Sequence, residues 1–115
     1  MTGIDVLFTA PPVADLTPAV DWYSRLGGRS PDVVVHDDEV MWRVVGPAWL
    51  YVLVDIDRAG HGLVTLGVAD LATTIAELAT RRLAEAPVAA VGTAGRRSIS
   101  ADPVGNAVTL VEATA

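Results

Sequence analysis

The side chain with the widest chemical scope in this sequence is His61. The chain has two histidines and no cysteine, and its eight basic residues are all arginine. A neutral imidazole can take up a proton as a general base or donate a hydrogen bond to a bound molecule. If the segment after it is a strand, positions 61, 63 and 65 share a face, so His61 would lie on the same side as Leu63 and Thr65. The alternative is a solvated or backbone-bonded linker residue. His36, beside two aspartates, is expected at the surface.

Three tryptophans supply the stacking surface that a small-molecule site needs. An indole ring offers a large apolar face together with one hydrogen-bond donor. Trp22 falls on the apolar stripe of an expected helix and is expected in the core. Trp42 and Trp49 lie in expected strands, where the pattern fits either core or pocket wall. Tyr51 alternates with Val52, so the two point to opposite sides of their strand, and Tyr51 is expected in the core.

Two sets of charged side chains could anchor a ligand. Glu39, Met41 and Arg43 alternate along an expected strand, so all three should lie on one of its faces. A solvated face is the simpler interpretation, but on a ligand-binding face Glu39 and Arg43 would be the polar anchors. Arg96 and Arg97 could likewise hold a carboxylate in a bidentate pair, or lie in a surface turn.

Several kinds of catalysis lack the residues that they need. Without cysteine there is no thiolate nucleophile, no disulfide and no cysteine-ligated zinc or iron–sulfur site, and without lysine there is no Schiff base. The serines do not stand in a nucleophile motif, and the glycine-containing segments do not form a phosphate-binding loop before a helix. Hydrolase and nucleotide-binding functions are therefore not supported.

Charge and hydropathy narrow the range of partners. The 14 acidic and 8 basic residues give a net charge of −6 and a pI near 4.6, which argues against nucleic-acid binding because that depends on basic surfaces. An acidic balance suits a cationic small molecule, or simply keeps a small domain in solution. The longest apolar runs, such as 49–54, are far shorter than the roughly 20 residues that span a bilayer. The N-terminus lacks the layout of a secretion signal, so we expect a cytoplasmic protein with no membrane partner.

An internal repeat organises the chain. The tetrapeptide Val-Ala-Asp-Leu occurs at 13–16 and again 55 residues later, at 68–71. Each copy follows a β-type run and precedes a helical pattern, for which Thr17 and Asp70 are the expected caps. Three strands are expected after each helix, at 33–36, 40–45 and 49–55 and then at 88–91, 97–101 and 107–112. The pattern predicts an α+β fold in which one domain, residues 1–115, contains two βαβββ modules at about 4–57 and about 61–112.

This order of elements and motifs resembles the vicinal-oxygen-chelate superfamily of glyoxalase, bleomycin-resistance and extradiol-dioxygenase-like proteins. The resemblance covers nearly the whole chain and is carried by Val13-x-Asp15-Leu16, Trp22-Tyr23-x-x-Leu26-x-Gly28 and Asp102-Pro103-x-Gly105-Asn106. It implies that the two modules form an open, cupped mixed sheet, with the helices on its outer face and the ligand in the cup. It also implies a homodimer, which fits the unpaired strand edges that an open sheet leaves.

Metal-dependent members of that superfamily place four ligands in the cup, from the first and last strands of each module. Counting back from the repeated motif puts Phe8 and Leu63 at the first-strand positions. Counting forward from the motif at 102–106 puts Thr109 at one last-strand position, and aligning the two modules makes Val52 its partner. Three apolar side chains and one hydroxyl do not form a divalent metal site. We therefore expect no metal and no cofactor.

Three functions are compatible with these patterns, because fold alone does not choose among them. The leading hypothesis is a metal-free protein that holds a small aromatic or cationic organic molecule in an apolar cup. The second is a metal-independent isomerase, lyase or oxygenase-like enzyme in which His61, the one catalytic candidate, acts as acid or base. The third is a structural or regulatory module whose own side chains fill the cup. The expected ligand-binding residues are Phe8, Trp42, Trp49, Val52, His61, Leu63, Thr65 and Thr109.

Overall fold

The computed structural model describes residues 2–83, 87–93 and 95–113. Its elements follow the order that the repeat predicts, a leading strand, a helix and three further strands in each module, except that the leading strand of the N-terminal module is divided into two short strands. The N-terminal module contains β1 (Leu7–Thr9), β2 (Pro12–Val13), α1 (Leu16–Gly27), β3 (Val33–His36), β4 (Glu39–Val45) and β5 (Ala48–Val54). The C-terminal module contains β6 (Leu63–Gly67), α2 (Leu71–Thr80), β7 (Val88–Val91), β8 (Gly95–Ala101) and β9 (Ala107–Ala113). The predicted α+β fold class is confirmed.

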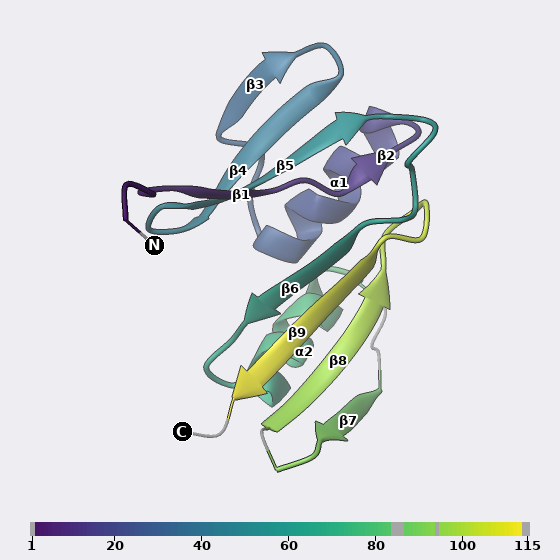
Figure 1. Cartoon of the computed structure of the whole chain (residues 1–115). Helices are drawn as coiled ribbons and strands as arrows, with labels where there is room; N and C mark the ends of the chain where they lie inside the picture. Colours follow the sequence, from purple (N-terminus) through teal and green to yellow (C-terminus); the bar gives the residue numbers. More distant parts are fainter. Residues whose placement is uncertain (1, 84–86, 94, 114–115) are drawn as a thin grey trace.

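Each module builds a mixed sheet around its last strand. In the N-terminal sheet, β5 pairs in parallel with β1 and β2 and antiparallel with β4, which in turn pairs with β3. In the C-terminal sheet, β9 pairs in parallel with β6 and antiparallel with β8, which pairs with β7. Figure 1 shows the two sheets side by side with both helices behind them.

The repeated aspartate begins both helices. Asp15 accepts a hydrogen bond from the backbone N–H of Thr17 at 3.3 Å, and Asp70 accepts one from Thr73 at 3.0 Å. Each carboxylate thus satisfies an N–H that has no partner within the first turn. Asp70 is confirmed as a cap, whereas at α1 the cap is Asp15 and not Thr17. In the part of the chain that the structure describes, no helix is long and apolar enough to cross a membrane.

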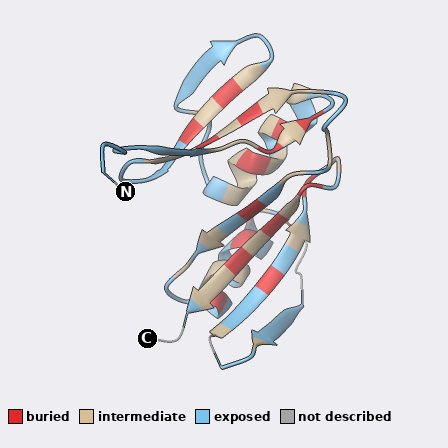
Figure 2. Cartoon of the chain, viewed as in Figure 1, coloured by how far each residue is buried: buried red, intermediate tan, exposed pale blue. Residues whose placement is uncertain are grey.

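The helices bury one side of both sheets in a shared core. The larger cluster joins residues of β4 and β5 to Val64 and Val108 of the other sheet, around Ala19 and Tyr23 of α1. The second cluster packs α2 against β9 and also receives Leu26 of α1. Along the strands of Figure 2, buried residues alternate with more exposed ones. Because one core spans both sheets, their helix-free sides also face one common direction.

Candidate ligand-binding face

The helix-free side of the two sheets forms one surface, which we call the open face. Strand pairing shows which residues lie on this face, because the side chains of two residues paired across neighbouring strands point to the same side of the sheet. From the N-terminal sheet it contains Phe8, Glu39, Met41, Arg43, Trp49, Tyr51 and Leu53. From the C-terminal sheet it contains Leu63, Thr65, Arg97, Ile99, Ala107, Thr109 and Val111. The alternation predicted for Glu39, Met41 and Arg43 is confirmed.

An aromatic cluster forms the N-terminal half of the open face. Phe8 on β1 pairs with Trp49 on β5 and makes an edge-to-face contact with Tyr51, with 6.1 Å between the ring centroids. Trp49 and Tyr51 are half-buried, and Phe8 keeps 46% of its surface exposed. The helices cover none of these rings, so the cluster presents an apolar stacking surface to solvent.

Trp42 and Val52 lie on the opposite, helix-facing side, which corrects their expected placement in the cup. Val52 is completely buried and Trp42 is 5% exposed, and both belong to the core around α1. The indole Nε1 of Trp42 donates to the carbonyl oxygen of Arg29 at 3.1 Å. Tyr51, expected in the core, takes the place on the open face that was expected for Val52.

The error comes from aligning the two modules one residue out of step. Phe8 and Leu63 each stand five residues before their copy of the repeat, and they pair with Trp49 and Ala107 respectively. Two residues further along the last strands stand Tyr51 and Thr109, which are therefore the equivalent pair. A strand has a side-chain period of two, so a slip of one residue moves the assignment to the other face. The equivalence of Tyr51 and Thr109 follows from the pairing of β1 with β5 and of β6 with β9, which the sequence does not show.

The C-terminal half of the open face carries three predicted residues. Thr65 on β6 pairs with Thr109 on β9, and Leu63 precedes Thr65 on the same side with 83% of its surface exposed. Ile99 on β8, which sequence reasoning did not single out, pairs with Thr109 and is 48% exposed. His61 lies just before β6 with an exposed side chain, and its backbone N–H donates to the carbonyl oxygen of Arg58.

The polar groups of the open face suit hydrogen bonding more than metal binding. The four positions equivalent to the superfamily's ligand positions hold Phe8, Tyr51, Leu63 and Thr109, two hydrocarbon side chains and two hydroxyls. Among the described residues, no group of three or more His, Asp or Glu side chains converges on one point. Divalent cations in proteins favour imidazole, carboxylate or thiolate ligands, so this donor set does not fit such an ion.

A buried polar network joins the two modules beside the open face. The side-chain oxygen of Asn106 accepts from the backbone N–H of Gly62 at 2.7 Å, and its Nδ2 donates to the carbonyl oxygen of Pro12 at 2.7 Å. Nδ2 also donates to Asp102 at 2.7 Å, and Asp102 accepts from the Tyr23 hydroxyl at 2.8 Å. The signature motifs that contain Tyr23, Asp102 and Asn106 thus hold β2, β6 and α1 together.

Tyr23 is kept protonated by this position. Burial, followed by the hydrogen bond to Asp102 and the negative charge of that carboxylate, raises the pKa of Tyr23 above its usual value. A phenolate there would have little water around it and a carboxylate 2.8 Å away. The hydroxyl therefore works as a structural donor and not as an acid–base group.

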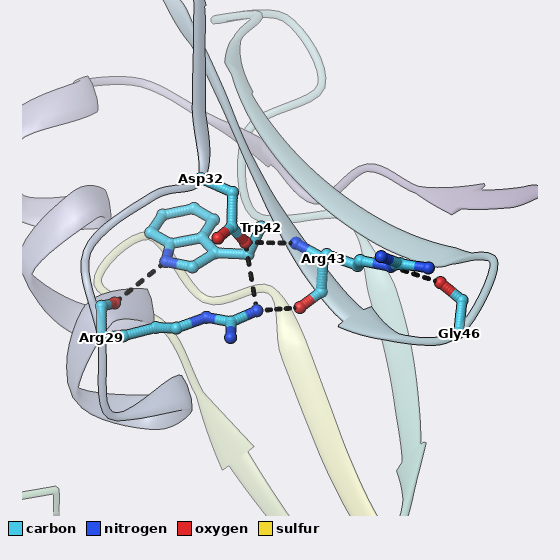
Figure 3. A network of polar contacts seen from close by, with 5 residues as sticks. All are labelled: Arg29, Asp32, Trp42, Arg43 and Gly46. Carbon is cyan, nitrogen blue, oxygen red and sulfur yellow. Dashed lines mark hydrogen bonds and ion pairs between the residues drawn. The ribbon is translucent and has the colours of Figure 1, made fainter.

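Side chains close the edge of β4 beyond the point where β3 begins (Figure 3). The backbone N–H of Arg43 donates to Asp32 at 2.7 Å, and the Arg29 guanidinium donates to the carbonyl oxygen of Arg43. Arg29 and Asp32 also form an ion pair at 3.1 Å. Arg29 and Asp32 thus occupy the carbonyl oxygen and the N–H of Arg43, to which the edge of another β-strand could otherwise form hydrogen bonds.

A hollow of about 300 Å³ lies on the helix side, between the modules. Its lining includes Leu26 of α1, Leu78 of α2, Leu66 of β6 and Trp42 of β4. It is separate from the aromatic cluster, which lies on the other side of the sheets.

Solved structures share this architecture, although no family model and no curated protein matches the sequence. The chain superposes with a TM-score of 0.88 on a glyoxalase/bleomycin resistance protein from Catenulispora acidiphila DSM 44928, at 28% identity over 95% of this chain and 98% of that one. The chain has the vicinal-oxygen-chelate fold. The resemblance that its motifs indicated is thereby confirmed.

Two further vicinal-oxygen-chelate structures match nearly end to end. An antibiotic binding protein from Streptomyces sp. CB03234 has a TM-score of 0.78 and 21% identity, and the match covers 99% of both chains. A bleomycin-binding protein from bleomycin-producing Streptomyces verticillus, complexed with copper(II)-bleomycin, has a TM-score of 0.78 and 20% identity over 99% of this chain and 100% of that one. At these identities the likeness concerns the fold alone.

Proposed function

We propose that this chain is a small-molecule-binding protein that holds a partly aromatic ligand on its open face without a metal ion. The observation that carries the proposal is the uncovered cluster of Phe8, Trp49 and Tyr51. Leu63 and Ile99, which are 83% and 48% exposed, extend the apolar surface onto the second sheet. Burying such surface yields about 25 cal/mol per Å², enough for micromolar affinity for a drug-sized ligand after ordering costs.

The similar structures support binding as the activity. Two of them are described as an antibiotic binding protein and a bleomycin-binding protein, and both match over almost the whole chain. A third is described as a lactoylglutathione lyase, from Agrobacterium tumefaciens, so the same fold also serves catalysis. The side chains of the open face favour the binding function here, because they offer rings and hydroxyls and few acid–base groups.

Absence of a metal is part of the proposal and rests on Phe8 and Leu63, whose hydrocarbon side chains have no donor atom. Tyr51 and Thr109 alone leave a cation mostly dependent on water for its ligands. Elemental analysis of freshly purified, untagged protein tests this point. Stoichiometric nickel, zinc, iron or manganese that is lost together with ligand binding on chelation would contradict it.

Calorimetric titration with a neutral aromatic probe, 2-naphthylmethanol, tests the site itself. Trp49→Ala should weaken binding by about 1–3 kcal/mol, as loss of a central aromatic contact usually does. Val45→Ala is the matched control, because Val45 lies on the neighbouring strand and is 69% exposed outside the cluster. Equal affinities in the wild type, Trp49→Ala and Val45→Ala would refute the assignment of the site.

Catalysis through His61 is the second candidate function, and it rests on an exposed imidazole next to β6. His61→Ala distinguishes the two functions when binding and turnover of the same compound are measured together. In a binding protein, the substitution lowers affinity modestly and no turnover is found in either form. Turnover that disappears with unchanged affinity would identify an enzyme.

A homodimer completes the proposal. The outer edge strands β3 and β7 each have one hydrogen-bonded neighbour, so backbone groups along their outer sides have no strand partner in the described structure. Pairing such an edge with a second copy would satisfy these groups and leave the open face accessible to a ligand. Light scattering at micromolar concentration should give twice the chain mass of 12.0 kDa, and a clean monomer at all concentrations would refute this part.

A further inference from the structure

Most arginines in this chain already have a partner for their charge. Of the eight, four form ion pairs with carboxylates, namely Arg25, Arg29, Arg58 and Arg96. Arg81 donates instead to the carbonyl oxygens of residues 25 and 26 at the end of α1. Within the described residues, Arg43, Arg82 and Arg97 therefore have no carboxylate partner.

Two of these three, Arg43 and Arg97, lie on the open face. Arg43 pairs with Trp49 across β4 and β5, and Arg97 pairs with Val111 across β8 and β9. In Figure 3 the Arg43 side chain runs away from the Trp42 ring, and its Nε donates to the carbonyl oxygen of Gly46 at 2.6 Å. That bond orients the guanidinium, while no described group pairs with its two Nη atoms.

Most of the acidic residues responsible for the net charge of −6 lie outside the strands, among them Asp32, which accepts from the backbone N–H of Arg43 and forms an ion pair with Arg29. The strands contain two of them: Glu39 on the open face, and Glu112, which binds the backbone N–H of Leu71 and pairs with Arg96. The paired strand positions of the open face thus hold two arginines and one carboxylate. Charges close to a ligand act on it more strongly than distant, screened ones, so this arrangement favours an anionic ligand over the cationic one that the net charge suggested.

We infer that the open face selects a small planar aromatic molecule that carries a carboxylate. This inference rests on the proposed function and adds the charge of the ligand. The aromatic ring stacks on Trp49 and Tyr51, and the carboxylate accepts hydrogen bonds from the Nη atoms of Arg43. Cross-strand neighbours such as Arg43 and Trp49 have Cβ atoms about 5 Å apart, which matches the short reach from a carboxylate to the ring that bears it. A guanidinium is also the side-chain group best shaped for a carboxylate.

The test uses three naphthalene probes of similar size in calorimetric titrations: 2-naphthoate, neutral 2-naphthylmethanol and the 2-naphthylmethylammonium cation. Each is titrated into the wild type, Arg43→Gln, Arg43→Lys and the control Arg82→Gln. The control removes the same charge from an exposed position after α2. Circular dichroism and thermal unfolding check that the variants fold.

The wild type should bind 2-naphthoate at least about tenfold more tightly than the ammonium probe. Arg43→Gln should weaken 2-naphthoate binding by about 10- to 100-fold and change 2-naphthylmethanol binding by less than about twofold. Arg43→Lys should retain part of the preference, and Arg82→Gln all of it. A preference for the cation, or 2-naphthoate binding that is the same in Arg43→Gln and Arg82→Gln, would overturn the inference while leaving aromatic binding intact. If none of the three probes binds, both this inference and the proposed binding function are refuted.

Discussion

Replacing Asn106 by alanine tests whether the buried network is what holds the two modules together. The side chain of Asn106 is fully buried and makes three hydrogen bonds of 2.7 Å, to Gly62, Pro12 and Asp102. Alanine removes all three while leaving the backbone of the turn in place. We expect a large loss of stability without a change of fold, because the elements of each sheet keep their own ladders.

The size of the loss follows from the groups that are left without a partner. The backbone N–H of Gly62 loses its acceptor, and the carbonyl oxygen of Pro12 keeps only a long contact of 3.4 Å from Gly60. Each buried polar group left unpaired costs about 1–3 kcal/mol. We therefore expect Asn106→Ala to lower the free energy of unfolding by about 3–5 kcal/mol, a large share of the roughly 5–15 kcal/mol typical of such domains.

Urea denaturation followed by tryptophan fluorescence and circular dichroism measures this change. Tyr23→Phe is the graded control, because it removes one hydrogen bond at the other end of the same network and should cost about 1–2 kcal/mol. If Asn106→Ala costs less than Tyr23→Phe, the bridge to Gly62 and Pro12 is not a main support of the junction, and the reasoning is refuted.

Three further predictions concern single groups. Because burial raises the pKa of Tyr23, the unfolded chain releases that proton first, so native stability should fall as pH rises above about 10, and Tyr23→Phe should flatten the fall in urea titrations. The hydrogen bond from the Leu71 N–H, with a nearby arginine, lowers the pKa of Glu112, so its contribution should be lost as pH falls below the ordinary value of 4.5. Thermal unfolding of Glu112→Gln should then depend less on acid than that of the wild type, and equal slopes would contradict this. Arg29→Ala should unblock the edge of β4 and increase concentration-dependent association in light scattering, whereas an unchanged particle mass would show that the edge needs no such cover.

Local patterns in the sequence were enough to predict the elements and the fold. The repeated Val-Ala-Asp-Leu located the start of both helices. An aspartate just before a helix can accept a hydrogen bond from a backbone N–H of the first turn, as Asp70 does from Thr73. Alternation placed Glu39, Met41 and Arg43 on one face, because the period of a strand is set by its own backbone. The absence of cysteine and lysine removed whole classes of chemistry without any structure.

The tertiary structure decided which face of each strand meets the ligand and which charges lie beside it. Tyr51 and Val52 exchange roles when the alignment slips by one residue, and only the pairing of β1 with β5 fixes that register. The bond from Asn106 to Pro12 joins residues 94 positions apart, and no local pattern signals it. Net charge is likewise a sum over the chain, whereas a ligand meets the few groups near it. Folding places Arg43 beside Trp49 and most carboxylates elsewhere. The electrostatic potential at the site depends on these distances, which only the folded chain defines.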